Sequence, residues 1–214
     1  MTRFFYPFFE GMYEMLTTLK QWQDRYFHFW DRLNVLRAGI LGANDGIISV
    51  SGIVLGAVGA DMSNTTLFIS GISGMVAGAC SMAGGEFVSV SAQKDVQLAK
   101  LNAQTTPNQR VTDFYQTRIH EIDLLNPLHA ATMSFLSFLL GAVIPLLAIS
   151  LSAPAWRLTN TLLAMAAALT INATVSAHNA EVPLAKVILR NILVGLVTAL
   201  VTYVMGTLLG GNVG

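Results

Sequence analysis

Five apolar stretches constrain this chain more than any other feature, because each is long enough to cross a membrane as a helix. The hydrocarbon core of a bilayer needs about 20 helical residues, and the stretches cover residues 38–60, 67–91, 128–150, 158–177 and 187–209. Each must be helical, since an isolated strand cannot satisfy its backbone hydrogen bonds in lipid. The fourth is the weakest because Thr, Asn and Ser side chains interrupt it, but a helix buried among other helices tolerates them. The sequence therefore predicts an all-α, polytopic membrane protein with five transmembrane helices.

The balance of charged residues excludes several other classes of protein. The chain of 214 residues carries 12 basic and 12 acidic side chains, and charged residues make up only 11% of it, whereas a soluble domain carries about 25%. Zero net charge argues against nucleic-acid binding, and a single cysteine, Cys80, leaves no disulfide framework or cysteine-cluster metal site. The sequence has no Walker A or GxSxG motif, so we expect no catalytic residues and no enzyme activity.

The basic residues predict the orientation, because Lys and Arg gather in cytosolic segments. Eleven of the 12 fall before the first span, between the second and third spans, or around the start of the fifth, and only Arg157 falls on the other side. We therefore expect the N-terminus, the loop 92–127 and the turn 178–186 in the cytosol. The short tail 210–214 is expected outside the cell or in a lumen.

Residues 1–37 are unusually aromatic and hold 11 of the chain's 19 Phe, Trp and Tyr side chains. Trp22, Tyr26 and Phe29 recur at helical spacing opposite charged and amide side chains, which predicts an amphipathic helix lying in the membrane interface. A gate or a contact between two copies is the alternative role. We therefore divide the chain into an interfacial segment, 1–37, a transmembrane domain, 38–209, and the tail.

Two acidic residues lie inside the spans: Asp45, within Gly-Ala-Asn-Asp-Gly at 42–46, and Glu86, within Gly-Gly-Glu-Phe at 84–87. A carboxylate in a bilayer costs several kcal/mol unless it is paired or hydrated, so it indicates a functional site by default. The alternative is that each lies close enough to the cytosolic end to reach the headgroups. No Lys or Arg occurs in the core of any span, so neither carboxylate has an obvious basic partner. Two unpaired carboxylates suggest that the site binds a cation.

Met82 precedes Glu86 by one helical turn and lies on the same helix face. Carboxylates alone suit Mg²⁺ or Ca²⁺, whereas an added thioether favours a softer first-row ion such as Fe²⁺. Ordinary packing is the alternative role for Met82. Its position beside Glu86 favours coordination.

Glycines are concentrated in the first two spans. Gly42 and Gly46 form a small-xxx-small pair, and Gly78 belongs to another, a spacing that lets helix backbones approach closely. The adjacent pair Gly84 and Gly85, beside Glu86, is a position where the second helix is expected to flex.

The loop 92–127 is the one long polar stretch inside the membrane domain. Thr105, Thr106, Pro107 and Asn108 form a breaker cluster between two short helical pieces. His120, Glu121 and Asp123 are a candidate cytosolic entrance for a metal ion, and a solvated loop face is the alternative. The four histidines are otherwise scattered, without an HxxxH pair, so the pattern gives no support for a helical zinc site.

Four motifs resemble the vacuolar iron transporter family. They are LRAGILGANDGIISVSGIVLG (36–56), ISGMVAGACSMAGGEFVSVSAQKD (72–95), NPLHAATMSFLSFLLGAVIPLL (126–147) and RNILVGLVTALVTYVMG (190–206). The resemblance implies a homodimeric transporter that moves Fe²⁺, and often Mn²⁺, out of the cytosol in exchange for protons, with no permanently bound cofactor. It also implies that Asp45 and Met82 line the ion pathway and that Glu86 falls in the adjoining motif.

The chain departs from the longer members of that family in one respect. Those members carry a helical cytosolic metal-binding insert with several Glu-x-x-Glu spacings, whereas 92–127 offers only Asp95, Asp113, Glu121 and Asp123. The chain therefore resembles the short, nodulin-like or prokaryote-type branch. This favours a prokaryotic cell membrane over a vacuolar membrane.

We therefore expect an exporter of divalent iron, and of manganese, that works by proton antiport, with Asp45 and Glu86 holding metal and protons in turn. The expected partners are the lipid bilayer, the transported ions and a second copy of the chain. The alternative is a non-transporting membrane scaffold, in which the glycines serve packing and the acids are interfacial. An intramembrane metal-dependent enzyme would need a nucleophile or water-activating group that the sequence lacks.

Overall fold

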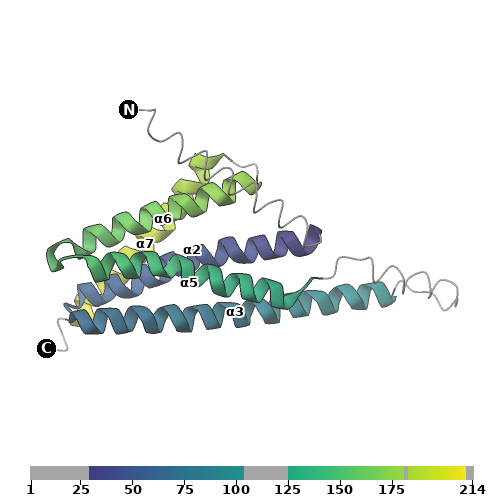
Figure 1. Cartoon of the computed structure of the whole chain (residues 1–214), viewed down its shortest axis with the longest axis horizontal. Helices are drawn as coiled ribbons and strands as arrows, with labels where there is room; N and C mark the ends of the chain where they lie inside the picture. The colour runs from purple at the N-terminus through teal and green to yellow at the C-terminus, as the bar shows by residue number, and fades with distance from the viewer. Residues whose placement is uncertain (1–28, 104–124, 181–182, 211–214) are drawn as a thin grey trace.

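The computed structural model describes residues 29–103, 125–180 and 183–210, and within these ranges the chain forms helices and no strand. The elements are α2 (Phe29–Gly59), α3 (Asn64–Ala103), α5 (Pro127–Leu151), the short 3-10 helix η1 (Pro154–Trp156), α6 (Arg157–Ala180) and α7 (Leu184–Gly210), shown in Figure 1. The aromatic segment up to residue 28 lies outside the described residues, so its interfacial role stays a prediction.

The expectation of five membrane-spanning helices is confirmed. Five helical stretches are long and apolar enough to cross a membrane: Leu33–Gly59, Asn64–Lys100, Pro127–Leu151, Pro154–His178 and Leu184–Gly210. The fourth qualifies despite its polar interruptions. The chain is therefore a polytopic integral membrane protein.

Successive helices run in opposite directions. One end of the bundle, where α2, α5 and α7 begin and α3 and α6 end, lies on the right in Figure 1. We call it the basic end, because the described basic residues Arg37, Lys94, Lys100, Lys186 and Arg190 belong to it. The opposite end, with Asp61 and Arg157, is called the far end.

Helix α3 is much longer than a membrane is thick. Its 40 residues make a rod of about 60 Å, whereas the hydrocarbon core is about 30 Å thick. The helix extends beyond the others at the basic end (Figure 1). The first part of the 92–127 loop is therefore a continuation of α3 as far as Ala103, and the predicted breaker cluster falls just outside the described residues.

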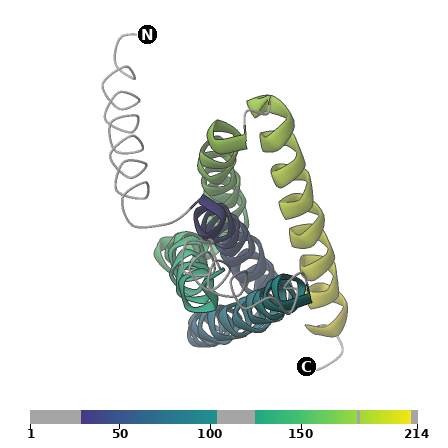
Figure 2. The same ribbon diagram turned by 90° about the vertical axis from the view of Figure 1, so that its right-hand side faces the viewer.

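Helix α2 lies at the centre of the bundle, and among the described helices it alone contacts the other four (Figure 2). On one side it shares a buried cluster with α3 and α5 that includes Val54, Phe138 and Leu146. On another side it shares a second cluster with α6 and α7 that includes Leu55 and Leu169. Helices α3 and α7 do not contact one another, and α2 lies between them and contacts both.

The contact between α2 and α5 is backbone against backbone. A Cβ atom on Gly42 would lie 2.6 Å from the carbonyl oxygen of Ser134, and one on Gly46 would lie even closer to that of Phe138. From the opposite helix, a Cβ atom on Gly141 would overlap the carbonyl oxygen of Ala43. In lipid, helices associate through such close packing, because the surrounding tails are as apolar as the side chains. These glycines hold α2 and α5 as one unit.

Candidate functional site

Two contacts set the register between the antiparallel helices α2 and α3. Near the basic end Ala38 and Val90 share one buried cluster, and further along the side chain of Ile53 lies against Gly74. Asp45 falls between these contacts, at the level of residues 82–83 on α3. The fold therefore brings Asp45 and Met82 to the same depth in the bundle, and Glu86 lies one turn, about 6 Å, nearer the basic end.

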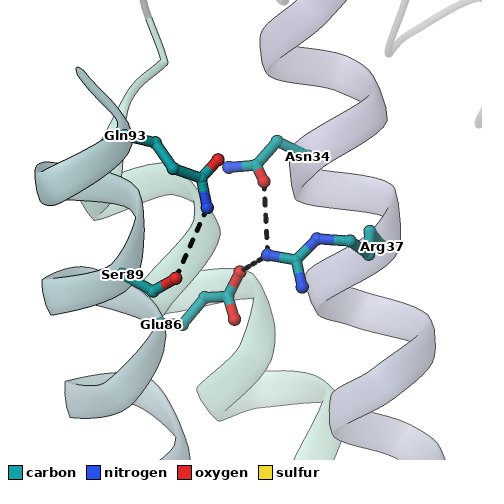
Figure 3. A network of polar contacts seen from close by, with 5 residues as sticks. All are labelled: Asn34, Arg37, Glu86, Ser89 and Gln93. Atoms are coloured by element: carbon teal, nitrogen blue, oxygen red, sulfur yellow. Dashed lines mark hydrogen bonds and ion pairs between the residues drawn. The ribbon is translucent and has the colours of Figure 1, made fainter. Parts of the chain in front are cut away.

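Glu86 is almost fully buried and forms an ion pair with Arg37 (Figure 3). Its side chain is 8% exposed, whereas that of Arg37 is 50% exposed. Nη2 of Arg37 also donates to Oδ1 of Asn34 at 3.3 Å. Next to this group, Nε2 of Gln93 donates to the hydroxyl oxygen of Ser89 at 3.4 Å. The group joins the first turns of α2 to α3.

The expectation that Glu86 lacks a basic partner is wrong. Arg37 directly precedes the first apolar stretch, a position that by hydropathy alone belongs to the cytosolic basic residues. Helix α2 continues without a break through this position, and the long arginine side chain can extend along the bundle while its head group stays accessible to water. A residue at the edge of one span therefore neutralises an acid inside the next.

Asp45 is partly buried and has a different environment. The hydroxyl of Ser49, one turn further along α2, donates to Oδ1 of Asp45 at 2.7 Å. Among the described residues no basic side chain pairs with Asp45. A carboxylate inside a span that no described basic side chain balances is the kind of group that attracts a metal ion or a proton.

Met82 lies on the face of α3 that meets the α2–α5 pair. Its half-buried side chain packs against the cluster that contains Val50, Val54 and Phe138. This is an apolar contact, and it holds the thioether at the depth of Asp45. One turn further toward the far end, Gly78 lies against the ring of Phe138.

Asn172 on α6 is a residue of the site that was not predicted from the sequence. Its buried Nδ2 donates to the backbone carbonyl oxygen of Ile40 at 3.2 Å and to Oδ1 of Asn44 at 3.5 Å. It therefore links α6 to α2 at the residue that directly precedes Asp45. In a hydropathy profile Asn172 is only one of the polar residues that interrupt the fourth span. An amide in an otherwise apolar helix nevertheless indicates a polar contact with another helix.

The glycine pair beside Glu86 has no packing partner among the residues that the structure describes. Gly84 and Gly85 are exposed, and nothing lies within 4 Å of a Cβ atom built on either one. Helix α3 is continuous through both residues. With Ser73, Ala77 and Ser81 they form an exposed face of small side chains, which we call the small-residue face of α3.

A hollow of about 600 Å³ opens at the far end between α2, α3 and α7. Ile53 and Gly56 line it from α2, Ser70 from α3 and Gly206 from α7, and Asp61 lies at its rim in the α2–α3 turn. By helical spacing, Ile53 and Gly56 lie on the same broad side of α2 as Asp45 and Ser49. One side of α2 therefore runs from the partly buried carboxylate of Asp45 to this hollow.

The described residues of one chain do not contain a complete metal site. They hold no group of three or more His, Cys, Asp or Glu side chains close enough to bind one ion. The predicted entrance residues His120, Glu121 and Asp123 lie outside the described ranges, so this prediction stays open to test.

Fold and site together define a polytopic membrane protein with separate carboxylates inside its helix bundle. The model of the VIT family matches residues 36–122 and 104–207, and the chain belongs to this family. It is 35% identical to "Vacuolar iron transporter homolog 3" of Arabidopsis thaliana over 192 residues, which cover 89% of this chain and 90% of the relative. It is 33% identical to "VIT-like transporter 1b" of Glycine max, with 86% and 80% covered.

A third relative matches a shorter part of the chain. "Vacuolar iron transporter homolog 5" of Oryza sativa subsp. japonica is 44% identical over 117 residues, which cover 55% of this chain and 52% of the relative. Only residues 104–126 connect α3 to α5, a length that leaves no room for a long helical insert. The chain is therefore a short member of the family without a cytosolic metal-binding domain, as its sequence predicted.

Proposed function

We propose that this protein transports divalent iron across a membrane along the side of α2 that carries Asp45. The observation that carries the proposal is the succession of acids across the bundle. Glu86 lies near the basic end, Asp45 lies one turn deeper at the depth of Met82, and Asp61 lies at the rim of the far-end hollow. Intramembrane carboxylates mark ion pathways, and the relatives named above are vacuolar iron transporter homologs.

The donor atoms suit Fe²⁺ and Mn²⁺. Carboxylate oxygens from Asp45 and Glu86 balance the two charges of the ion as it sheds water, and the thioether of Met82 favours the softer Fe²⁺. Metal ligands must be deprotonated to bind, so a proton that enters from the acidic side weakens the hold of a carboxylate on the metal. Release of the metal is in this way coupled to uptake of a proton, which supports antiport.

The direction of transport is out of the cytosol, with the basic end cytosolic. Lys and Arg gather on the cytosolic side of membrane proteins. In a Cys80→Ala background, a cysteine placed at Asn212 should react with an impermeant thiol reagent added outside intact cells, and one at Asn108 should not. The reverse pattern would overturn this orientation. The short form of this chain favours a prokaryotic cell membrane as its location. The relatives named above are plant proteins.

Two copies form the working unit in this proposal. One chain offers few donors at the depth of Asp45, and a second copy against the same side of α2 would double them. The faces needed for such a contact are open: Leu41 and Ile53 on α2 are 45% and 38% exposed, and the small-residue face of α3 permits close approach.

A flux assay tests the transport function. The full chain is reconstituted in liposomes, and uptake of Fe²⁺, Mn²⁺, Zn²⁺ and Ca²⁺ is followed under an imposed pH gradient, with protein-free liposomes as the control. We expect uptake of Fe²⁺ and Mn²⁺ that rises with the gradient and is accompanied by proton movement the other way. A folded, reconstituted protein that moves none of these ions would favour the scaffold alternative.

A further inference from the structure

The ion pair at the basic end joins two unequal partners. Glu86 is held inside the bundle at 8% exposure, while the guanidinium of Arg37 lies on a side chain that is half exposed. The same Nη2 atom of Arg37 touches two oxygens, Oε1 of Glu86 and Oδ1 of Asn34, the latter at 3.3 Å (Figure 3). The positive group thus occupies a position between a carboxylate oxygen and an amide oxygen.

Both oxygens are of the kind that bind divalent cations, because carboxylates and side-chain carbonyls are ligands of hard and borderline metals. Asn34 is itself buried, and its Nδ2 atom has no hydrogen-bond partner. Its orientation directs the oxygen, not the nitrogen, toward the cation position.

We propose that Asn34 and Glu86 form the first binding site for the metal ion at the basic end and that Arg37 occupies this site until a metal displaces it. The proposal rests on the transport function proposed above and assigns a ligand, Asn34, and a competing residue, Arg37. A buried carboxylate without a counter-charge is strongly disfavoured. The arginine therefore stabilises the empty site and lowers its apparent affinity for metal.

Because the side chain of Arg37 is half exposed, its guanidinium group can leave the position beside Glu86. A long basic side chain at the end of a span can turn its head group toward water or lipid phosphates at little cost. Glu86 and Asn34 are both buried and stay in place. Return of the guanidinium to Glu86 then promotes release of the ion inward, toward Asp45, which has no basic partner among the described residues.

The first experiment compares Arg37→Gln with a matched control, Arg190→Gln, which removes an exposed basic side chain from the same end of the bundle. Binding of Mn²⁺ to the full chain in nanodiscs is titrated by electron paramagnetic resonance, and Mn²⁺ uptake is measured in liposomes. We expect Arg37→Gln to tighten Mn²⁺ binding about tenfold, which corresponds to about 1.4 kcal/mol, and to slow uptake at saturating metal. Arg190→Gln should change neither quantity by more than about twofold, as expected for a screened surface charge.

Two further variants separate competition from a structural role. Arg37→Lys, which keeps a positive charge, should restore the affinity of the parent. In a Glu86→Gln background, Arg37→Gln should no longer tighten binding, because the contested carboxylate is gone. Asn34→Leu should weaken binding in the presence and in the absence of Arg37.

The results that would overturn the proposal are distinct from those that would overturn transport. Unchanged or weaker Mn²⁺ binding in Arg37→Gln, with a lower midpoint of thermal unfolding, would make the ion pair a structural bridge between α2 and α3. Failure of both parent and Arg37→Gln to bind Mn²⁺ would remove the site altogether. Tightened binding in Arg37→Gln without any metal flux through the parent would support the site and refute the transport function.

Discussion

The residues of α2 that meet α5 and the residues of α2 around Asp45 differ in what fills the space beside them. Toward α5, Gly42 and Gly46 bring backbone against backbone, and no space is left for a side chain. Away from this contact, Asp45 and Ser49 are partly buried, and Ile53, which lines the far-end hollow, is 38% exposed. A path for ions needs side chains that can change partners, and the fixed contact between α2 and α5 holds those side chains at a constant depth.

Adding a methyl group at the contact between α2 and α5 should have the largest effect on stability. Gly46→Ala would place a Cβ atom against the carbonyl oxygen of Phe138, and backbone of a paired helix cannot move aside as a side chain can. We expect a loss of at least about 3 kcal/mol in the free energy of unfolding, measured by thermal unfolding in detergent. Gly84→Ala is the matched control, because nothing lies within 4 Å of its Cβ position. Equal stability of the two variants would contradict the close α2–α5 contact.

Removing the negative charge of Asp45 should abolish transport while the fold is retained. Asp45→Asn keeps the shape of the side chain and can still accept the Ser49 hydrogen bond, but it cannot balance a divalent ion. We expect Fe²⁺ uptake into liposomes to fall by at least about 100-fold, because changing even a partner of a metal ligand costs about 10- to 100-fold. Asp95→Asn, at an exposed position on the extension of α3, should leave uptake unchanged. Uptake near the parent value in Asp45→Asn would remove this acid from the pathway.

A change at Met82 tests whether the apolar contact on α3 also serves the ion. Met82→Leu conserves volume and costs little in packing. If the thioether binds metal, Fe²⁺ uptake should fall about threefold more than Mn²⁺ uptake, because Mn²⁺ relies more on oxygen ligands. Both ions are measured on one protein sample, so differences in reconstitution cancel. An unchanged ratio would leave Met82 as a packing residue only.

The smallest expected effect concerns the polar contact from α6. Asn172→Leu removes the donor that bonds Ile40 and Asn44, and a hydrogen bond between membrane helices contributes about 1 kcal/mol. Thermal unfolding should show a loss of that size. Thr170→Val is the control, since this hydroxyl bonds the carbonyl of Ala166 on its own helix. If both variants are equally stable, the hydrogen bonds from Asn172 to α2 make no measurable contribution to the stability of the protein.

The two acids were identifiable from the sequence because a carboxylate in an apolar stretch is conspicuous, but of their partners only the local one was. Ser49 follows Asp45 by four residues, so local spacing was enough to place it. Arg37 and Glu86 are 49 residues apart, and they meet only because α2 and α3 are antiparallel in one register. Asn172 lies even further along the chain from Asn44, and its role depends on which face of α6 turns inward.

The sequence by itself determined the number of spans and their helical form. In lipid each helix must satisfy its own backbone hydrogen bonds, so its formation depends on local hydropathy and length. Only the tertiary structure decided that α2 is central, that Gly42 and Gly46 meet α5 whereas Gly84 and Gly85 stay open, and that Arg37 neutralises Glu86. Hydropathy does not distinguish one apolar neighbour from another, because helices in lipid choose partners through shape and polar contacts among all five at once.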